Sequence, residues 1–384
     1  MAIKLEKTSW QTTPFEKFAF NISERVEPND TTLDKYVGLE HLDSGKPVIE
    51  RFGKPDEVIG TKLKLYKGDV IFGKRRAYQR KAAIADFDAI CSAHSMVLRA
   101  NEEIVTRDFL INFMHSDLFM NRAVSISEGS LSPTIKWKTL AKQEFSLPPL
   151  DEQERLVELF QSIEQSIIQA EKQEDNLLVL KSQLLRELVS DKKKFGNFLT
   201  VKDFENVKFE KIALNISERV EPKQTDLEIY VGLEHLDSDD LVIRRKGKPE
   251  DVIGTKLKIF KGDIIFGKRR AYLRKVAVSD FDGIVSAHSM VLRANEENIE
   301  KDFLPYFMQS DEFMNRAVQI SEGSLSPTIK WKTLAQQEFI LPKREQQAKL
   351  VDMFKQFDEA RELIRQQKET LKQLKQKLLN EILG

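Results

Sequence analysis

Two stretches of the chain place apolar residues at alternating steps of four and three, and neither stretch contains glycine or proline. In residues 150–190 the apolar positions are Leu156, Phe160, Ile163, Ile167 and Ala170, and after an interruption at Glu174 they resume as Leu177, Leu180, Leu184 and Leu188. In residues 350–383 they are Leu350, Phe354, Phe357, Ala360, Ile364, Leu371, Leu374, Leu378 and Ile382. This spacing is typical of a coiled-coil seam. It predicts two helices of roughly 60 Å, too long for a compact domain.

The rest of the chain consists of two copies of a similar sequence. Four segments recur with the same offset of 194 residues: NISERVEP at Asn21 and Asn215, YVGLEHLDS at Tyr36 and Tyr230, GKRRAY at Gly73 and Gly267, and SEGSLSPTIKWKTL at Ser127 and Ser321. A constant offset means that no net insertion separates the copies. A repeat of this length indicates a duplicated domain with one fold, and the long helices repeat with it.

Within each copy the pattern is mixed and rich in short strands. Residues 61–73 predict two strands separated by a Lys-Gly-Asp turn, and residues 89–100 predict one strand. Residues 107–124 have helical spacing, with Asp108 as a possible N-cap. Pro148 and Pro149 exclude helix behind them and predict a stiff elbow into the first long helix, which Pro342 repeats before the second.

We therefore expect an α+β chain in which two duplicated mixed α/β domains are separated by two long helices. The expected order is a first globular domain (1–149), a first spacer helix (150–192), a connector with the second domain (193–343) and a second spacer helix (344–384). The polar connector between Asp191 and Asp203 is short, so the second domain must lie near the C-terminal end of the first long helix. This favours an antiparallel coiled coil with pseudo-twofold symmetry.

Composition narrows the function classes. Charged residues make up 32% of the 384 residues, yet the formal net charge is zero. The signs are segregated: residues 61–81 hold eight Lys or Arg against one Asp, whereas residues 151–175 hold eight acids against two bases. The single cysteine, Cys91, excludes an internal disulfide and fits a reducing compartment. With no apolar run of membrane-spanning length and no signal-peptide pattern, we expect a cytoplasmic protein and no membrane contact.

The strongest candidate site is a basic cluster that follows a strand and begins at Gly73. Its candidate DNA-binding residues are Lys74, Arg75, Arg76, Tyr78, Arg80 and Lys81, repeated as Lys268, Arg269, Arg270, Tyr272, Arg274 and Lys275. Lys136 and Lys138 flank Trp137, and Lys330 and Lys332 flank Trp331, which gives a second candidate cluster. Arg can contact guanine edges in a bidentate manner, and both Lys and Arg neutralise phosphates. A solvated basic loop and a tryptophan packed under its domain are the plainer interpretations.

No catalytic pattern accompanies these clusters. The chain lacks a phosphate-binding Lys loop, a G-x-G-x-x-G segment and a G-x-S-x-G segment. His41 and His94 recur as His235 and His288, and no carboxylate or second His stands at metal-ligand spacing from them. Glu40 beside His41 suggests a structural hydrogen bond more than an acid-base pair. We therefore expect no catalytic residue, no metal and no cofactor.

The segments GDVIFGKRRAYQRKAAIADFDAICS, YVGLEHL, SPTIKWKTL and LPPLDEQERLV, with the order of domains and helices, resemble the specificity subunit of type I restriction-modification systems. The resemblance covers essentially the whole chain, and its most specific segment, LPPLDEQ, is weakened to LPKREQQ in the second copy. It implies two target-recognition domains that read the halves of a bipartite site in double-stranded DNA. It also implies that methyltransferase (M) and restriction (R) subunits, which carry the catalysis, dock on the chain.

This sequence departs from the pattern of that family in one respect. Recognition domains of such subunits generally differ, whereas between Gly53 and Tyr78 the copies differ at only five positions, all conservative. Two near-identical recognition domains related by a twofold axis should bind DNA half-sites related by the same axis, so we expect a palindromic or nearly palindromic site. The alternatives are a specificity subunit that serves a methyltransferase without a nuclease, a coiled-coil adaptor for an acidic protein, and a nuclease in its own right.

Overall fold

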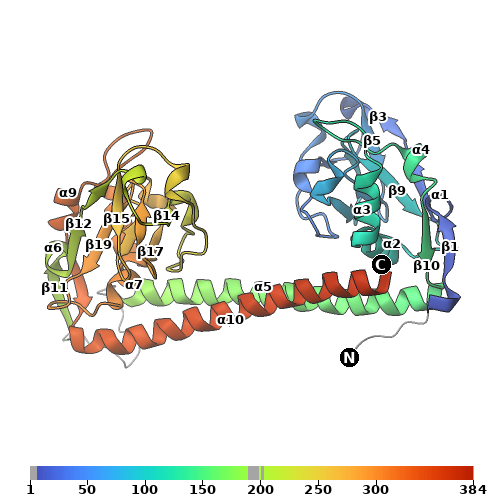
Figure 1. The fold of residues 1–384 in the computed structure, drawn as a ribbon. Helices are drawn as coiled ribbons and strands as arrows, with labels where there is room; N and C mark the ends of the chain where they lie inside the picture. Colours follow the sequence, from blue (N-terminus) through green and yellow to red (C-terminus); the bar gives the residue numbers. More distant parts are fainter. Residues whose placement is uncertain (1–6, 189–198, 200–202, 384) are drawn as a thin grey trace. The chain divides into compact units, whose positions relative to one another are not determined.

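The computed structural model describes residues 7–188, 199 and 203–383, and the chain divides into two compact units. Unit 1 comprises residues 1–171 and 366–384, and unit 2 comprises residues 172–365. Each unit holds one globular domain together with a part of each long helix (Figure 1). The same elements follow in the same order in both domains.

The globular domain of unit 1 is built from short strands and short helices. Its strands are β1 (Gln11–Pro14), β2 (Ala19–Ile22), β3 (Arg25–Val26), β4 (Tyr36–Val37), β5 (Lys62–Leu65), β6 (Val70–Phe72), β7 (Ala82–Ile84), β8 (Ala89–Cys91), β9 (Met96–Ala100) and β10 (Glu144–Leu147). Its helices are α1 (Phe15–Phe18), α2 (Arg107–Met114), α3 (Asp117–Ser125), α4 (Trp137–Leu140) and the 3-10 turn η5 (Ala77–Gln79). The strands form two four-stranded sheets, β2-β9-β6-β7 and β3-β5-β8-β4, and a separate β1-β10 pair. All pairs are antiparallel except β4 with β8.

The sheet β2-β9-β6-β7 is buried on both faces, because its strands alternate between two cores. Val70 and Phe72 of β6 join a core with helices α2 and α3, whereas Ile71 between them joins a core with Leu65 and Cys91 of the second sheet. Burial raises the pKa of Cys91 to about 12, so this thiol is a packing residue, as the Val at the matching place in the second copy suggests. The layers are therefore helices, sheet and sheet.

The globular domain of unit 2 repeats this plan. Its strands are β11 (Phe204–Lys208), β12 (Ala213–Ile216), β13 (Arg219–Val220), β14 (Tyr230–Val231), β15 (Lys256–Ile259), β16 (Ile264–Phe266), β17 (Val276–Val278), β18 (Gly283–Val285), β19 (Met290–Ala294) and β20 (Glu338–Pro342). Its helices are α6 (Phe209–Ile212), α7 (Phe303–Gln309), α8 (Asp311–Gln319), α9 (Trp331–Ala335) and the 3-10 turn η10 (Ala271–Leu273). The sheets are β12-β19-β16-β17, β13-β15-β18-β14 and β11-β20.

The long helices are α5 (Leu150–Leu188) and α10 (Arg344–Leu383). In unit 1 the first turns of α5, with Leu156 and Phe160, share a core with the last turns of α10, with Leu379 and Ile382. In unit 2 the order is reversed, because Leu185 near the end of α5 lies in one core with residues 350–354 of α10. The helices therefore run antiparallel in each unit, and this prediction is confirmed.

The predicted seam is correct along the first part of α5 and wrong further on. Leu156, Phe160, Ile163, Ile167 and Ala170 are buried, but Leu180 and its counterpart Leu374 are exposed. Lys181 and Lys375, one position later, point inward instead. Each inward lysine pairs with a carboxylate of the other helix: Lys181 with Asp358 at 2.6 Å, and Lys375 with Glu164 at 2.5 Å. The side chain of Leu188 and most of the connector between Asp191 and Asp203 lie outside the described residues.

The elbow into each long helix is fixed by a buried glutamine. The Gln153 side chain donates to the Pro148 and Ile104 carbonyls at 2.9 and 2.8 Å and accepts from the Thr106 amide at 3.0 Å. Gln347 repeats this role, since it donates to the Pro342 carbonyl at 2.8 Å and accepts from the Glu300 amide at 2.7 Å. The second copy thus keeps the glutamine of the LPPLDEQ segment that holds the helix to its domain.

The helical spacing of residues 107–124 is confirmed, but three details of the smaller elements differ from what the sequence suggested. Residues 107–124 form two helices, because the Ser116 hydroxyl caps α3 by accepting from the Phe119 amide. The cap of α2 is Thr106, whose hydroxyl accepts from the Phe109 amide, and not Asp108. Residues 89–100 form two strands, β8 and β9, with a turn between them that presents His94.

Candidate nucleic-acid interface

The predicted basic cluster forms a tight turn between β6 and β7. We call residues 73–81 and 267–275 the basic turns. The Gly73 amide donates to the Lys81 carbonyl at 2.9 Å, which closes the base of the turn. Arg76 and Arg80 flank the 3-10 turn with left-handed φ values of 57° and 53°, and Arg270 and Arg274 repeat this with 57° and 52°. Non-glycine residues seldom adopt such backbone, and they persist there only where the surrounding structure holds them.

A second loop supplies that support. The Arg76 amide donates to the Pro133 carbonyl at 2.8 Å, and the Ile135 amide donates to the Lys74 carbonyl at 2.9 Å. The loop itself is closed by paired hydrogen bonds between Glu128 and Thr134, at 3.0 and 2.9 Å. Unit 2 repeats these contacts with Pro327 and Ile329. The SPTIKW segment therefore buttresses the basic turn, so the two predicted clusters lie side by side.

The structure sorts the predicted residues into two groups. Arg80 and Lys81 are anchors: Arg80 pairs with Asp117 at 2.6 Å and donates to the His115 carbonyl, and Lys81 donates to the Leu39 carbonyl at 2.6 Å. Arg274 and Lys275 have the same role in unit 2, where they contact Asp239, Asp311 and the carbonyls of Gln309 and Leu233.

The outward residues are Arg75, Arg76 and Tyr78. The Tyr78 ring is exposed, and Arg76 contacts the Ser132 hydroxyl at 3.3 Å. Lys136 pairs with Glu128 at 2.6 Å and Lys330 pairs with Glu322 at 2.6 Å, while Lys138 is exposed. Trp137 is partly buried and packs edge-on against Phe15 with ring centroids 6.0 Å apart, and Trp331 packs against Phe209 in the same way, in line with the packing interpretation of these tryptophans. The two basic turns differ only at Gln79 and Leu273.

A histidine that the sequence analysis did not place among the candidate DNA-binding residues lies beside the first arginine of each turn. His94 Nε2 lies 3.4 Å from Arg75 Nη1, and His288 Nε2 lies 3.2 Å from Arg269 Nη1. Burial, and after it the charge of the neighbouring arginine, lowers the pKa of both histidines. The rings are therefore neutral at pH 7 and can accept from the guanidinium. The recurrence of His94 in a short polar turn of both copies was the available signal.

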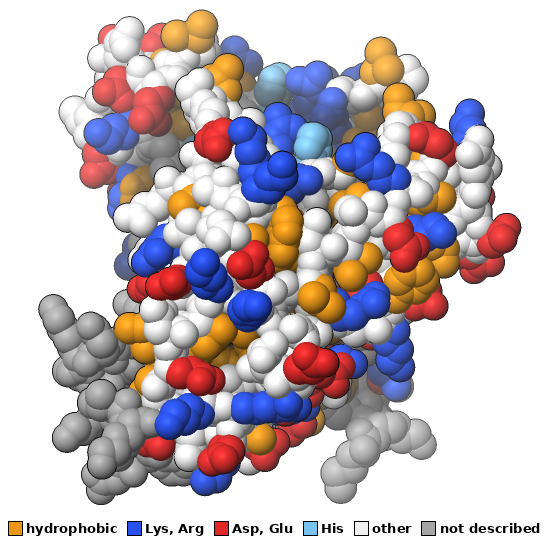
Figure 2. Space-filling model, turned by 90° about the vertical axis from the view of Figure 1, so that its left-hand side faces the viewer, with side chains coloured by type: hydrophobic (Ala, Val, Ile, Leu, Met, Phe, Trp, Pro, Cys, Tyr) orange, Lys and Arg blue, Asp and Glu red, His pale blue; other side chains and the backbone are white. Residues whose placement is uncertain are grey.

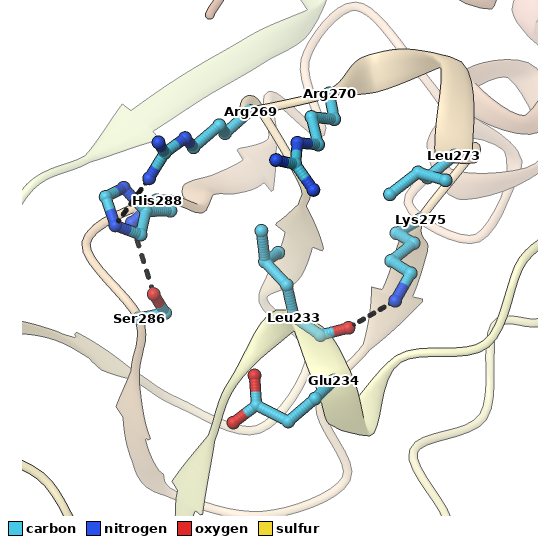
Figure 3. A pocket seen from close by; sticks show the side chains of 8 residues that line it. All are labelled: Leu233, Glu234, Arg269, Arg270, Leu273, Lys275, Ser286 and His288. Atoms are coloured by element: carbon cyan, nitrogen blue, oxygen red, sulfur yellow. Dashed lines mark hydrogen bonds between the residues drawn. The ribbon is translucent and has the colours of Figure 1, made fainter. Parts of the chain in front are cut away.

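In unit 2 the outward side of the turn borders an open pocket of about 400 Å³. Figure 3 shows the guanidinium groups of Arg269 and Arg270 at one side of this pocket and the Glu234 carboxylate at the other. Donors and an acceptor that face one space are the set needed to contact base edges. Glu234 lies 3.9 Å from His235, whose Nδ1 accepts from the Gly232 amide at 3.0 Å, so this histidine has the structural role expected of its counterpart His41.

The wider surface agrees with an anionic ligand. On the face drawn in Figure 2, Lys and Arg side chains gather around histidine near the upper edge, whereas the two signs alternate lower down. In residues 7–188, 199 and 203–383 no group of three or more His, Cys, Asp or Glu side chains is placed to hold a metal ion. None of the described helices is long and apolar enough to span a bilayer.

Comparison with known proteins decides the family. The type I restriction modification DNA specificity domain matches the chain twice, at residues 29–179 and 223–373. The chain belongs to this family. The family assignment confirms the resemblance read from the sequence and the DNA-specificity role, without catalysis, that it implied.

Relatives of this specificity chain agree with the assignment. It is 28% identical over 184 residues to the type I restriction enzyme EcoDI specificity subunit of Escherichia coli, a match that covers 47% of the chain and 41% of that subunit. It is 23% identical over 303 residues to the MjaVIII specificity subunit of Methanocaldococcus jannaschii, which covers 71% of the chain and 70% of the relative.

Two solved structures share the fold. One, from a study of complex assembly and conformational transition of the type I R-M system, has a TM-score of 0.62 at 19% identity and covers 98% of both chains. The other, the type I S subunit of M. genitalium, has a TM-score of 0.55 at 12% identity, with 100% of this chain and 98% of that one covered.

Proposed function

We propose that this specificity chain binds a bipartite, palindromic or nearly palindromic site in double-stranded DNA, and that each basic turn reads one half-site. The observation that carries this proposal is the presence of two basic turns with the same backbone and the same outward side chains. Each turn offers two guanidinium groups beside an exposed tyrosine. A good bidentate contact between Arg and guanine discriminates by roughly 1–3 kcal/mol against the wrong base.

The partners are part of the same proposal. We infer that methyltransferase (M) and restriction (R) subunits dock on this chain, and that it acts in the cytoplasm, where its DNA ligand is found. A chain that recognises but does not catalyse needs such subunits to modify or cut the DNA. One structural relative comes from a study of complex assembly in the type I R-M system, which supports this inference. A methyltransferase-only assembly without a nuclease stays an alternative.

The experiment is to co-express the chain with a cognate methyltransferase and to map methylated adenines across a host genome. We expect a bipartite motif with inverted, matching halves. Arg75→Ala and Arg269→Ala should each relax one half of the motif. Because the halves are equivalent on opposite strands, the two variants should produce the same relaxed motif. Lys349→Ala, an exposed lysine of α10, is the matched control and should leave the motif unchanged.

A methylated motif with two different half-sites would refute the proposed palindromic site but would still support the DNA-recognition role. If no new methylation occurs while the methyltransferase is active, the recognition role itself fails, and salt-sensitive binding to an acidic protein becomes the interpretation to test.

A further inference from the structure

A second pocket on the other flank of the basic turn has the features of an anion site. In unit 2 it has a volume of about 340 Å³ and is lined by residues that include Arg219, Lys268, Ser289, Lys330 and Trp331. All five recur in unit 1, as Arg25, Lys74, Ser95, Lys136 and Trp137. Lys268 belongs to the predicted cluster, but Arg219 and Ser289 come from other elements and were not predicted.

Two of the three cations of this pocket lack an acidic partner, whereas the third, Lys330, pairs with Glu322. In the described part of the chain neither Arg219 nor Lys268 forms an ion pair, and the same holds for Arg25 and Lys74. Burial lowers the pKa of Lys268, and the charge of Arg219 lowers it further. Arg219 is exposed and Lys268 is partly buried, so two neighbouring positive charges repel each other, and an anion between them would remove that repulsion.

A buried hydroxyl completes the set. Ser289 lines the pocket and is fully buried, yet its Oγ has no hydrogen-bond partner, and the same is true of Ser95. A buried polar group without a partner is costly and unusual, which points to a partner that arrives with a ligand. A phosphate group offers acceptor oxygens to a hydroxyl, a guanidinium and an ammonium together.

We propose that this pocket binds a backbone phosphate of the DNA and thereby sets the position of the basic turn on the duplex. The inference rests on the proposed function. It assigns Lys268, Arg219 and Ser289 to positioning and leaves base reading to Arg269 and Arg270. Phosphate contacts fix the register of a protein on DNA but carry no sequence information of their own.

The test measures DNA affinity against salt concentration for the chain in complex with its methyltransferase. Each phosphate contact contributes ~0.9 to the slope of log affinity against log salt, so Lys74→Met with Lys268→Met should lower the slope by ~1.8. The methylated motif should stay unchanged, whereas Arg269→Ala should relax it. Lys74→Arg with Lys268→Arg keeps both cations and should retain the slope.

The outcomes separate the two proposals. If the unaltered complex binds DNA and the Met variant keeps its slope and affinity, the pocket holds no phosphate and the inference is wrong. If the Met variant loses sequence preference, these lysines read bases instead, which also overturns it. If the unaltered complex does not bind DNA at all, the proposed function fails first.

A different observation concerns the helix pair. The copies are near-identical, but around the long helices they carry opposite charges at matching places. On the loop of residues 43–52 and 237–246, Lys46 and Glu50 correspond to Asp240 and Arg244. On the helices, Glu171 corresponds to Arg365 and Glu174 to Lys368. Each of these four pairs reverses sign, in contrast to the conservative differences between Gly53 and Tyr78.

In unit 2 these residues form one buried network. The Asp240 carboxylate, only 6% exposed, pairs with Arg244 at 2.7 Å, Arg365 at 2.8 Å and Arg361 at 3.5 Å. Glu174 of α5 pairs with both Arg361 and Arg365 of α10. Although burial acts to raise the pKa of Asp240, the hydrogen bond from Arg365 and the charges of Arg244 and Arg361 bring that pKa below its ordinary value.

Unit 1 uses the opposite signs. Lys46 pairs with Glu50 at 2.8 Å, and the hydrogen bond to Glu50, with the charges of Glu50 and of Glu171 on α5, raises the pKa of Lys46. By the 194-residue offset, Lys368 of α10 holds the place that Glu174 of α5 holds in unit 2. In unit 2, therefore, Glu174 of α5 contacts two arginines of α10. In unit 1 the matching position on α10 is Lys368, and the other helix, α5, carries Glu171.

We infer that this charge reversal directs α5 to pair with α10 of the same chain and disfavours pairing with the same helix of a second copy. If α10 paired with another α10, Lys368 would replace Glu174 beside Arg361 and Arg365. If α5 paired with another α5, Glu174 would replace Lys368 near Glu171. Like charges would meet in both cases, which is how polar positions select partners in coiled coils.

The test exchanges the two residues in the full chain. Glu174→Lys with Lys368→Glu keeps composition and net charge but reverses the preference, so we expect the exchanged chain to associate with a second copy and its mass by light scattering to double at least. Glu154→Lys with Lys349→Glu is the matched control, since both side chains are exposed on the same helices. The control should keep the mass of the original chain.

An exchanged chain with unchanged mass and unchanged melting temperature would overturn the inference. If the exchanged chain fails to fold, a mutant cycle decides. Glu174→Lys and Arg365→Glu should each lower the melting temperature, and the double variant should recover most of the loss because the pair is restored with its signs reversed. Additive losses in the double variant would overturn the inference.

Discussion

The inward lysine of α5 gives the sharpest stability prediction. Lys181 is 4% exposed, its Nζ lies 2.6 Å from Asp358 Oδ1, and the Tyr306 hydroxyl donates to the other oxygen of Asp358 at 2.8 Å. Burial lowers the pKa of Lys181, and Asp358 opposes that shift. Asp358→Asn removes the compensating charge and leaves a desolvated ammonium.

The magnitude follows from burial. Removing one partner of a buried ion pair costs roughly 3–5 kcal/mol, and because Asp358 is 29% exposed we expect the lower end, about 3 kcal/mol. The copy in unit 1 is the matched control: Lys375 is 11% exposed and Glu164 is 26% exposed, and Asn112 stands where unit 2 has Tyr306. The better hydrated Lys375 tolerates the loss of its partner, so Glu164→Gln should cost about half as much.

The assay is denaturant unfolding of the full chain followed by circular dichroism. The Asp358→Asn deficit should shrink as the pH rises toward the ordinary range of lysine, because the folded state then holds Lys181 neutral while the unfolded state still binds the proton. Lys181→Met with Asp358→Leu should recover most of the stability, since an apolar pair can replace a buried ion pair. An Asp358→Asn chain no less stable than the Glu164→Gln chain would refute this reasoning.

Two further predictions concern the domain and the spacer. Burial lowers the pKa of His115 to about 4, so the unfolded state takes up a proton first and stability should fall as the pH drops from about 6.5 to about 4, by at most ~3 kcal/mol. His115→Gln, which copies Gln309 of unit 2, should lose less stability between pH 7 and pH 5, as measured by denaturant midpoints; equal losses would contradict the buried neutral histidine. Removing one heptad from both α5 and α10 shortens the spacer by roughly 10 Å, so the gap between methylated half-sites should shrink by about three base pairs. A shortened chain that keeps the original gap would contradict the idea that the length of the helices sets the distance between the half-sites.

The sequence predicted the large features because they repeat. The constant offset was sufficient to predict the duplicated domains, and two heptad patterns with a short connector were sufficient to predict the antiparallel helices. The prediction that Leu180 lies in the buried seam was wrong because hydrophobic periodicity takes no account of long charged side chains. Lys181 points inward instead, where it pairs with a carboxylate of the other helix. That partner lies far along the chain, where periodicity gives no information.

The candidate site was predicted in part for a related reason. Charge and position found the basic turn, but they could not tell outward arginines from anchors. Arg80 and Arg76 look alike in the sequence, yet Arg80 is engaged by Asp117 while Arg76 faces outward. The histidine beside Arg75 came from a different strand connection, which only the tertiary fold brings near.

The division of the basic turn into anchors and outward residues has an evolutionary consequence. The backbone of the turn is held by carbonyl contacts of Arg80 and Lys81 and by the buttressing loop, so exchange of the outward side chains at 75, 76 and 78 leaves the scaffold intact. New sequence preferences can therefore arise by point substitution. If each turn reads one half-site as proposed, one substitution in one copy would turn a symmetric recognition sequence into an asymmetric one, and gene duplication would become a source of new specificity.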